Sequence, residues 1–280
     1  MRVYISADIE GITGLVSWSQ CSRPDGNSYD YPFARRMMTH DVNAAVRGAR
    51  KGGATDIVIK DSHGNSKNLL IDELESGVHL VSGHGCGIDG MMEGIDAAFD
   101  AAMLVGYHGM AGASDALMEH ALVGGLHRFW INDRPAGEIL VSAGVGAAYG
   151  VPVVLVASDG AGCSEASHAI PGIVSCCTKH GFGKYMGQLL PPSVTRPVLE
   201  RSAKRALDRL KLIPPVTIEG PVKMRASFRT AEQAELAAIV PGVRRLDGYT
   251  LEWDNESFLD AHRLALVVFQ LSVQGRRSQE

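Results

Sequence analysis

The sequence predicts an α/β fold in which helices flank a mostly parallel sheet, with a smaller C-terminal α+β unit. In the first two thirds of the chain, short apolar runs alternate with helical patterns, as in successive βαβ units. These runs end in Gly, Asp, Ser or His, as strands do where they pass into loops. Near residue 190 a charged amphipathic segment follows, closed by Pro214 and Pro215. We therefore expect an α/β metal-binding catalytic domain over residues 1–190 and a smaller α+β domain over residues 191–280.

The elements follow one another in a regular order. The chain opens with a strand at residues 3–11, and helical periodicity over residues 33–53 stops at two glycines. Further strands are expected at residues 56–64, 78–85, 101–109, 128–133 and 151–160, with a small-residue helix over residues 137–150. After the helix at residues 193–213, the C-terminal unit reads strand 217–228, helix 230–242, strand 249–256 and helix 257–274.

Composition excludes several function classes. The chain has 280 residues, of which 45% are hydrophobic and 21% charged, so it can bury a sizeable core. Its formal net charge of -4 gives no reason to expect nucleic acid or an anionic membrane as a partner. The five cysteines show no CxxC spacing, and one stays unpaired in any full disulfide scheme. We see no apolar run of about 18 residues and no signal-peptide pattern at the start, so we expect a cytoplasmic protein.

Acids and histidines follow the predicted strands at their carboxyl ends. Asp8 and Glu10 follow the first strand, His63 the second and His108 the fourth. Glu138 begins the helix after residues 128–133, a strand that we expect to end at the same edge of the sheet. Carboxylates and imidazoles together bind zinc, with manganese or cobalt as substitutes. With Asp8 as a bridge, the set can hold two metal ions and activate water for hydrolysis.

Further polar residues are candidates for supporting roles. His120, twelve residues after His108, is the candidate for an acid/base or covalent role, and Glu119 is a weaker one. The remaining groups either serve the site or form caps, turns and cavity walls: His84, Asp159, Asp61, Ser62, Asn132 and Asp133. A single such residue at a strand end is usually structural, and only the convergence of several on one edge of a sheet indicates a site.

Residues 85–90 match the GxGxxG pattern of dinucleotide-binding loops. That fingerprint expects an acid at the end of the next strand, where this chain has Tyr107 and His108. We do not expect a dinucleotide cofactor.

The sequence resembles the DppA-type zinc D-aminopeptidases in five segments. They are Ser6-Ala7-Asp8-Ile9-Glu10-Gly11, Lys60-Asp61-Ser62-His63, Gly106-Tyr107-His108, Met118-Glu119-His120 and Ile131-Asn132-Asp133-Arg134-Pro135-Ala136-Gly137-Glu138. The resemblance implies two zinc ions per subunit, with Asp8 as the bridge, Glu10 and His108 on one ion, and His63 and Glu138 on the other. It also implies that His120 is the catalytic histidine.

By the same resemblance, we expect an enzyme that removes N-terminal D-residues, typically D-Ala, from short peptides and assembles into a ring-like homo-oligomer. Two alternatives remain. A two-metal site also suits phosphoesters or other amides, although no Lys or Arg cluster accompanies the convergent residues. A non-enzymatic binding protein on the same scaffold is the other. The sequence leaves the physiological peptide, its stereochemistry, the metal loaded in the cell and the number of subunits open.

Overall fold

The fold is built on a seven-stranded sheet in the order β3-β2-β1-β4-β7-β8-β9. The computed structural model describes residues 1–21, 30–84 and 87–277, so Gly85 and Cys86 of the glycine motif lie outside it. All neighbouring strands are parallel except β8 and β9, which confirms the predicted sheet. The strands are β1 (Arg2–Ala7), β2 (Asp56–Asp61), β3 (His79–Val81), β4 (Ala101–Tyr107), β7 (Val153–Asp159), β8 (Val174–Gly181) and β9 (Gly187–Leu189).

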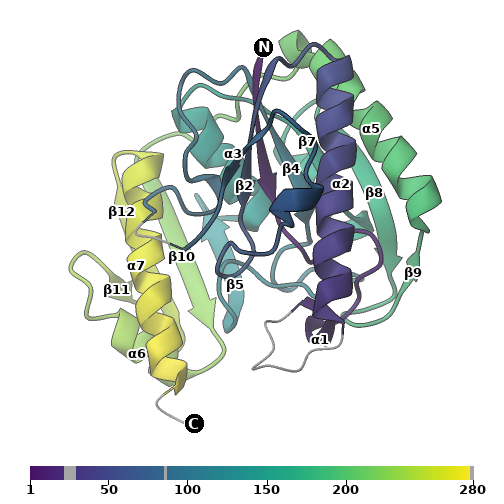
Figure 1. Cartoon of the computed structure of the whole chain (residues 1–280). Helices are drawn as coiled ribbons and strands as arrows, with labels where there is room; N and C mark the ends of the chain where they lie inside the picture. The colour runs from purple at the N-terminus through teal and green to yellow at the C-terminus, as the bar shows by residue number, and fades with distance from the viewer. Residues whose placement is uncertain (22–29, 85–86, 278–280) are drawn as a thin grey trace.

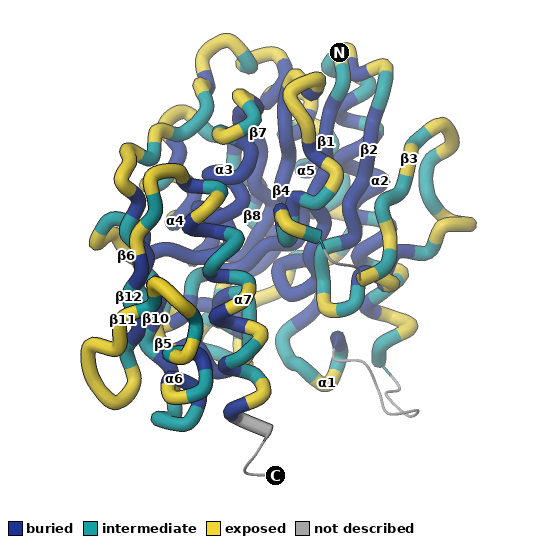
Figure 2. The backbone as a smooth tube through the Cα atoms, turned by 90° about the vertical axis from the view of Figure 1, so that its left-hand side faces the viewer, coloured by how far each residue is buried: buried dark blue, intermediate teal, exposed yellow. Residues whose placement is uncertain are grey.

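Helices cover both faces of this sheet (Figure 1). Helices α2 (Tyr31–Lys51) and α5 (Pro192–Asp208) pack together on one face, and α3 (Glu138–Ala148) and α4 (Gly160–Ala169) pack together on the other. Strands covered on both sides must be apolar at nearly every position. Accordingly, β4 and β7 are buried along their whole length, and β1 is buried after its first residue (Figure 2). The shorter helices are α1 (Trp18–Cys21) and the 3-10 turns η1 (Ile71–Glu73), η2 (Gly90–Met92) and η3 (Leu210–Leu212).

A second, antiparallel sheet has the order β11-β12-β10-β5-β6. Its strands are β5 (Leu126–Ile131), β6 (Arg134–Pro135), β10 (Val222–Phe228), β11 (Arg244–Arg245) and β12 (Thr250–Asn255). Residues alternate between buried and half-buried along β10, because only one face of this sheet is covered. Helix α7 (Phe258–Arg277) packs on that face beside α6 (Ala231–Ala237), and it also contacts α3.

One expectation about the strand at residues 128–133 is wrong. The strand forms, as β5, but it pairs antiparallel with β10 in the second sheet and does not end at the edge of the parallel sheet. Asn132 and Asp133 form the tight turn to β6, with φ values of 49° and 62°. A short apolar run shows that a strand forms but not which partner it pairs with, because partner choice depends on distant residues.

The expected boundary near residue 190 stays a prediction. The second sheet takes β5 and β6 from before that position, and α5 after it packs on the parallel sheet. Within the described ranges, no helix combines the length and apolar character needed to cross a membrane.

Candidate metal centre

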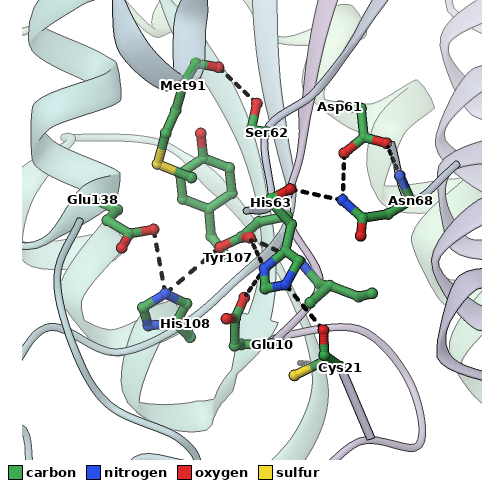
Figure 3. A network of polar contacts seen from close by, with 12 residues as sticks. Glu10, Cys21, Asp61, Ser62, His63, Asn68, Met91, Tyr107, His108 and Glu138 are labelled. Atoms are coloured by element: carbon green, nitrogen blue, oxygen red, sulfur yellow. Dashed lines mark hydrogen bonds and ion pairs between the residues drawn. The ribbon is translucent and has the colours of Figure 1, made fainter. Parts of the chain in front are cut away.

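The ends of β1, β2 and β4 bring distant acids and histidines together. Figure 3 shows Glu10, His63, His108 and Glu138 converging from different elements on one small space. The loop after β1 is fastened to β4, because the backbone amide of Asp8 donates to the carbonyl of Val105 at 2.8 Å. Glu138 reaches the same place as the first residue of α3, not from a parallel strand.

Two glycines permit this close approach. A Cβ at Gly11 would collide with the backbone carbonyl of Tyr107, and one at Gly106 would collide with that of Asp8. Gly106 also has a φ of +80°, which L side chains rarely adopt. The glycines of the first and third family segments are therefore required by the backbone that carries Asp8 and His108.

All five residues predicted as metal ligands lie together. His63 Nδ1 is 3.1 Å from Glu10 Oε2 and 3.4 Å from Asp8 Oδ1. His108 Nε2 is 3.2 Å from Glu138 Oε2 and 3.5 Å from Asp8 Oδ2. Asp8 therefore lies between the two imidazoles, with one carboxylate oxygen toward each.

Backbone carbonyls orient both imidazoles. The Nδ1 of His108 lies 3.0 Å from the carbonyl of Gly109, and the Nε2 of His63 lies 3.2 Å from that of Cys21. Because a carbonyl can only accept, each contact places the proton of a neutral ring on that nitrogen. The other nitrogen, which faces the carboxylates, then carries a lone pair, as a metal ligand requires.

The donor set fits a divalent cation. Asp8 Oδ2 and His108 Nε2 are buried and have no hydrogen-bond partner among the described residues. Buried polar atoms without partners are costly, and three buried carboxylates repel one another. Burial and the charge of Glu10 raise the pKa of Asp8 to about 8. A cation between these groups removes both penalties, and carboxylate with imidazole is a typical zinc ligand set.

The other site groups respond to the same charges. Burial opposes ionisation of Glu138, but the charges of His108 and His120 outweigh it and lower its pKa to about 2. For Glu10, His63 likewise overcomes burial and lowers the pKa well below its usual range. The Sγ of Cys21, which sequence reasoning left out, lies within 4.8 Å of ligand atoms of Glu10 and His63. Burial raises the pKa of this thiol.

His120 faces the same centre from the loop after β4. Its Nε2 is 3.6 Å from Glu138 Oε1 and 3.9 Å from Glu10 Oε1, and its ring stacks on His108 with centroids 4.1 Å apart. The ring of Trp18 packs against the His120 ring in a T-shaped arrangement, with the two ring centroids 4.8 Å apart. Burial, followed by the charge of His108, lowers the pKa of His120.

The loop between β8 and β9 holds the His120 segment in place. Lys184 Nζ donates to the carbonyl of Glu119 at 2.9 Å and to its carboxylate at 2.6 Å, and the amide of Met118 donates to the Lys184 carbonyl at 2.8 Å. The indole of Trp18 donates to the hydroxyl of Tyr185 at 3.1 Å. Glu119 is therefore engaged as an ion-pair partner that positions its neighbour.

Sequence reasoning missed Lys179. Its side chain is fully buried, and its Nζ donates to the carbonyls of Glu10, Ile12 and Leu15, which shapes the loop after β1. Burial lowers the pKa of this amine to about 8. The signal that could have identified it is a lysine within a strand-like segment, because a charge buried in a sheet needs internal acceptors.

The remaining polar groups have supporting positions. Asp61 accepts hydrogen bonds from the amide and side chain of Asn68 at 2.6 and 2.8 Å, and Asn68 Nδ2 donates to the His63 carbonyl at 2.7 Å. Ser62 donates to the Met91 carbonyl. Asp159 caps α4, accepting from Gly162 at 2.9 Å, and His84 lines the cavity over the centre.

A cavity of about 1450 Å³ opens over the centre. Its floor includes Asp8, Glu10, His63, His120 and Glu138, and its opposite wall includes Arg229 and residues of α7. The volume exceeds that of a typical small-molecule site, so it accommodates a short peptide.

Comparison with known proteins agrees with this geometry. The model of a peptidase family described as D-aminopeptidase matches residues 1–267 of this chain. A D-aminopeptidase of Bacillus subtilis (strain 168) is 30% identical over 275 residues, which are 98% of each protein. The solved structure of the Zn-dependent D-aminopeptidase DppA from Bacillus subtilis, a self-compartmentalizing protease, matches with a TM-score of 0.93 at 30% identity and covers 98% of each chain. The resemblance predicted from the five segments is confirmed, and the chain belongs to the D-aminopeptidase family.

Proposed function

We propose that the chain is a dinuclear zinc aminopeptidase that hydrolyses the N-terminal residue of short peptides, with D-residues such as D-Ala as the preferred substrates. The observation that carries the proposal is the buried group of three carboxylates and two imidazoles, in which Asp8 Oδ2 and His108 Nε2 make no hydrogen bond to any described residue. Membership of the D-aminopeptidase family supports the reaction, and the zinc dependence of the B. subtilis structure supports the metal.

We assign the zinc ligands to Asp8, Glu10, His63, His108 and Glu138, with Asp8 shared. The shortest contacts pair His63 with Glu10 and His108 with Glu138. These contacts differ from the pairing implied by the resemblance, whereas Asp8, Glu10 and His108, which offer ligand atoms within 4.8 Å of one another, support its first ion. When bound, two zinc ions would lower the pKa of a water molecule and polarise the scissile carbonyl.

The residues of the chain supply orientation and proton transfer. His120 Nδ1 lies 3.0 Å from the Met118 carbonyl, so in the neutral ring the lone pair is on Nε2, which faces the centre. We assign to this atom proton transfer in two steps: it accepts a proton from the water that attacks the peptide bond and then donates it to the leaving amine. Trp18 covers the ring of His120, which keeps water from that side.

The B. subtilis relative is a self-compartmentalizing protease, and we propose that this chain forms a ring-like homo-oligomer in the cytoplasm. Large apolar side chains of the β8–β9 hairpin support association: Phe182, Tyr185 and Met186 are 61%, 53% and 64% exposed. The four cysteines among the described residues are free, as the cytoplasm favours.

Metal removal tests the proposal. Dialysis against a chelator should abolish hydrolysis of D-Ala-D-Ala, and two equivalents of zinc per chain should restore it, with zinc counted by elemental analysis. L-Ala-L-Ala and a chromogenic phosphoester are assayed in parallel. If the zinc-loaded chain releases no amino acid from any peptide, or prefers the phosphoester, the proposed function is wrong.

A further inference from the structure

Four Lys or Arg side chains line the cavity over the metal centre, and three of them are already engaged. They are Lys60, Lys184, Arg229 and Arg263. Lys60 Nζ donates to the Asp61 carbonyl at 2.6 Å and to Ser66 Oγ at 2.9 Å. Lys184 is bound by Glu119, and Arg263 lies 3.7 Å from Asp89 and 4.0 Å from Asp260.

Arg229 differs from these three. Its side chain is exposed, and among the described residues no carboxylate lies within ion-pair distance of its guanidinium, which also makes no hydrogen bond. Its charge still reaches the segment that carries His120, because against the effect of burial, and after the contacts with Lys184 and Gly112, it helps to lower the pKa of Glu119. With Glu119 bound to Lys184, Arg229 leaves one uncompensated positive charge on this wall.

The backbone limits how far Arg229 lies from the metal centre. The amide of Leu122 donates to Glu138 Oε1 at 2.6 Å, and the amide of Arg229 donates to the Gly125 carbonyl at 2.9 Å. These two contacts and the short stretch from Leu122 to Gly125 keep the Arg229 backbone within roughly 20 Å of Glu138, and the Arg229 side chain lines the same cavity as the centre.

We propose that Arg229 binds the C-terminal carboxylate of the peptide substrate and so favours short peptides with a free carboxyl end. This inference rests on the proposed function, because the N-terminal residue must lie at the metal centre. Guanidinium and carboxylate match in charge and in their paired hydrogen-bonding geometry. A peptide whose C-terminus is blocked offers no negative charge to this side chain.

The test compares two substrates that differ only in this charge. D-Ala-D-Ala and its C-terminal amide are assayed with the zinc-loaded wild type, with Arg229→Met and with Arg229→Lys. We expect the wild type to have a KM about threefold lower for the free acid than for the amide, as a solvent-screened pair at an exposed arginine provides. Arg229→Met should raise the KM of the acid to that of the amide, without changing kcat or the KM of the amide. Arg229→Lys should restore part of the difference.

The controls separate this inference from the proposed function. Arg209→Met removes an exposed arginine that does not line the cavity, so it should leave both KM values unchanged. If wild type hydrolyses acid and amide with equal KM, or if Arg229→Met weakens both equally, the carboxylate assignment is wrong while the aminopeptidase activity stands. If the zinc-loaded wild type hydrolyses neither, the proposed function itself is overturned.

Discussion

The two walls of the cavity over the metal centre differ in burial and charge. The wall formed by the ends of β1, β2 and β4 carries Asp8, Glu10 and His108, whose side chains are at most 3% exposed. The facing wall, from α7 and the start of the segment before α6, carries Arg229, which is exposed, and Arg263, whose side chain is 38% exposed. From this difference we infer that the rigid sheet edge carries out the chemistry and that the facing wall selects the substrate.

Burial explains why the two walls suit different tasks. At the sheet edge, desolvation strengthens every interaction with a bound cation and fixes the geometry of its ligands. On the facing wall, solvent screens the charges, so a contact there contributes less to binding but adapts to different substrates. Substitutions at the sheet edge should therefore change kcat or zinc affinity, and substitutions on the facing wall should change KM.

The largest effect is expected from His120, at the sheet edge but outside the ligand set. His120→Gln keeps a polar side chain but cannot transfer a proton, so kcat should fall by about 10²- to 10⁴-fold. Zinc content by elemental analysis should stay at the wild-type value. A parallel loss of zinc would show that His120 is a ligand, as its distance of 3.6 Å from Glu138 would also allow.

A smaller effect is expected from Asn68, which positions His63. Asn68→Ala removes the hydrogen bonds to Asp61 and to the His63 carbonyl, so zinc affinity should fall about 10- to 100-fold, measured by competition with a chelator. Asn43→Ala is the matched control, because the Asn43 side chain also donates to a backbone carbonyl, that of Glu73, and accepts from the amide of Glu75, away from the centre. Equal zinc affinity in the two variants would contradict a positioning role for Asn68.

The smallest effect is expected from His262, in α7, and concerns stability alone. Burial lowers its pKa to about 4, against the attraction of Asp89. The unfolded chain, with a histidine pKa near 6.5, therefore binds more protons than the folded chain between about pH 4 and 6.5. This contribution to stability is complete above pH 6.5 and is lost as the pH falls toward 4, by about 1 kcal/mol per pH unit.

In His262→Gln, urea denaturation between pH 7 and pH 4.5 should show a shallower loss of unfolding free energy than in the wild type. Zinc content and kcat should not change, since the side chain contacts Phe258 and not the centre. Identical pH slopes for the two proteins would rule out His262 as a source of the pH dependence.

Local patterns in the sequence predicted much of the fold and the candidate site. Alternating strand and helix signals gave the parallel sheet, because each element buries a face that its own residues define. Asp8, His63 and His108 could be predicted to converge, because parallel strands end at one edge. Their assignment as ligands stays a prediction.

Tertiary structure alone decided the rest. β5 pairs with β10 across nearly a hundred residues, so Glu138 begins a helix as expected, but the strand before it does not end at the edge of the parallel sheet. Lys179 and Lys184 depend on contacts with carbonyls and a carboxylate far away in the chain. The sequence by itself determined which elements form and which residues carry chemistry, since these depend on periodicity and residue type. Which sheet a strand joins, and which lysines and arginines remain unpaired, depend on the packing of segments that share no local pattern.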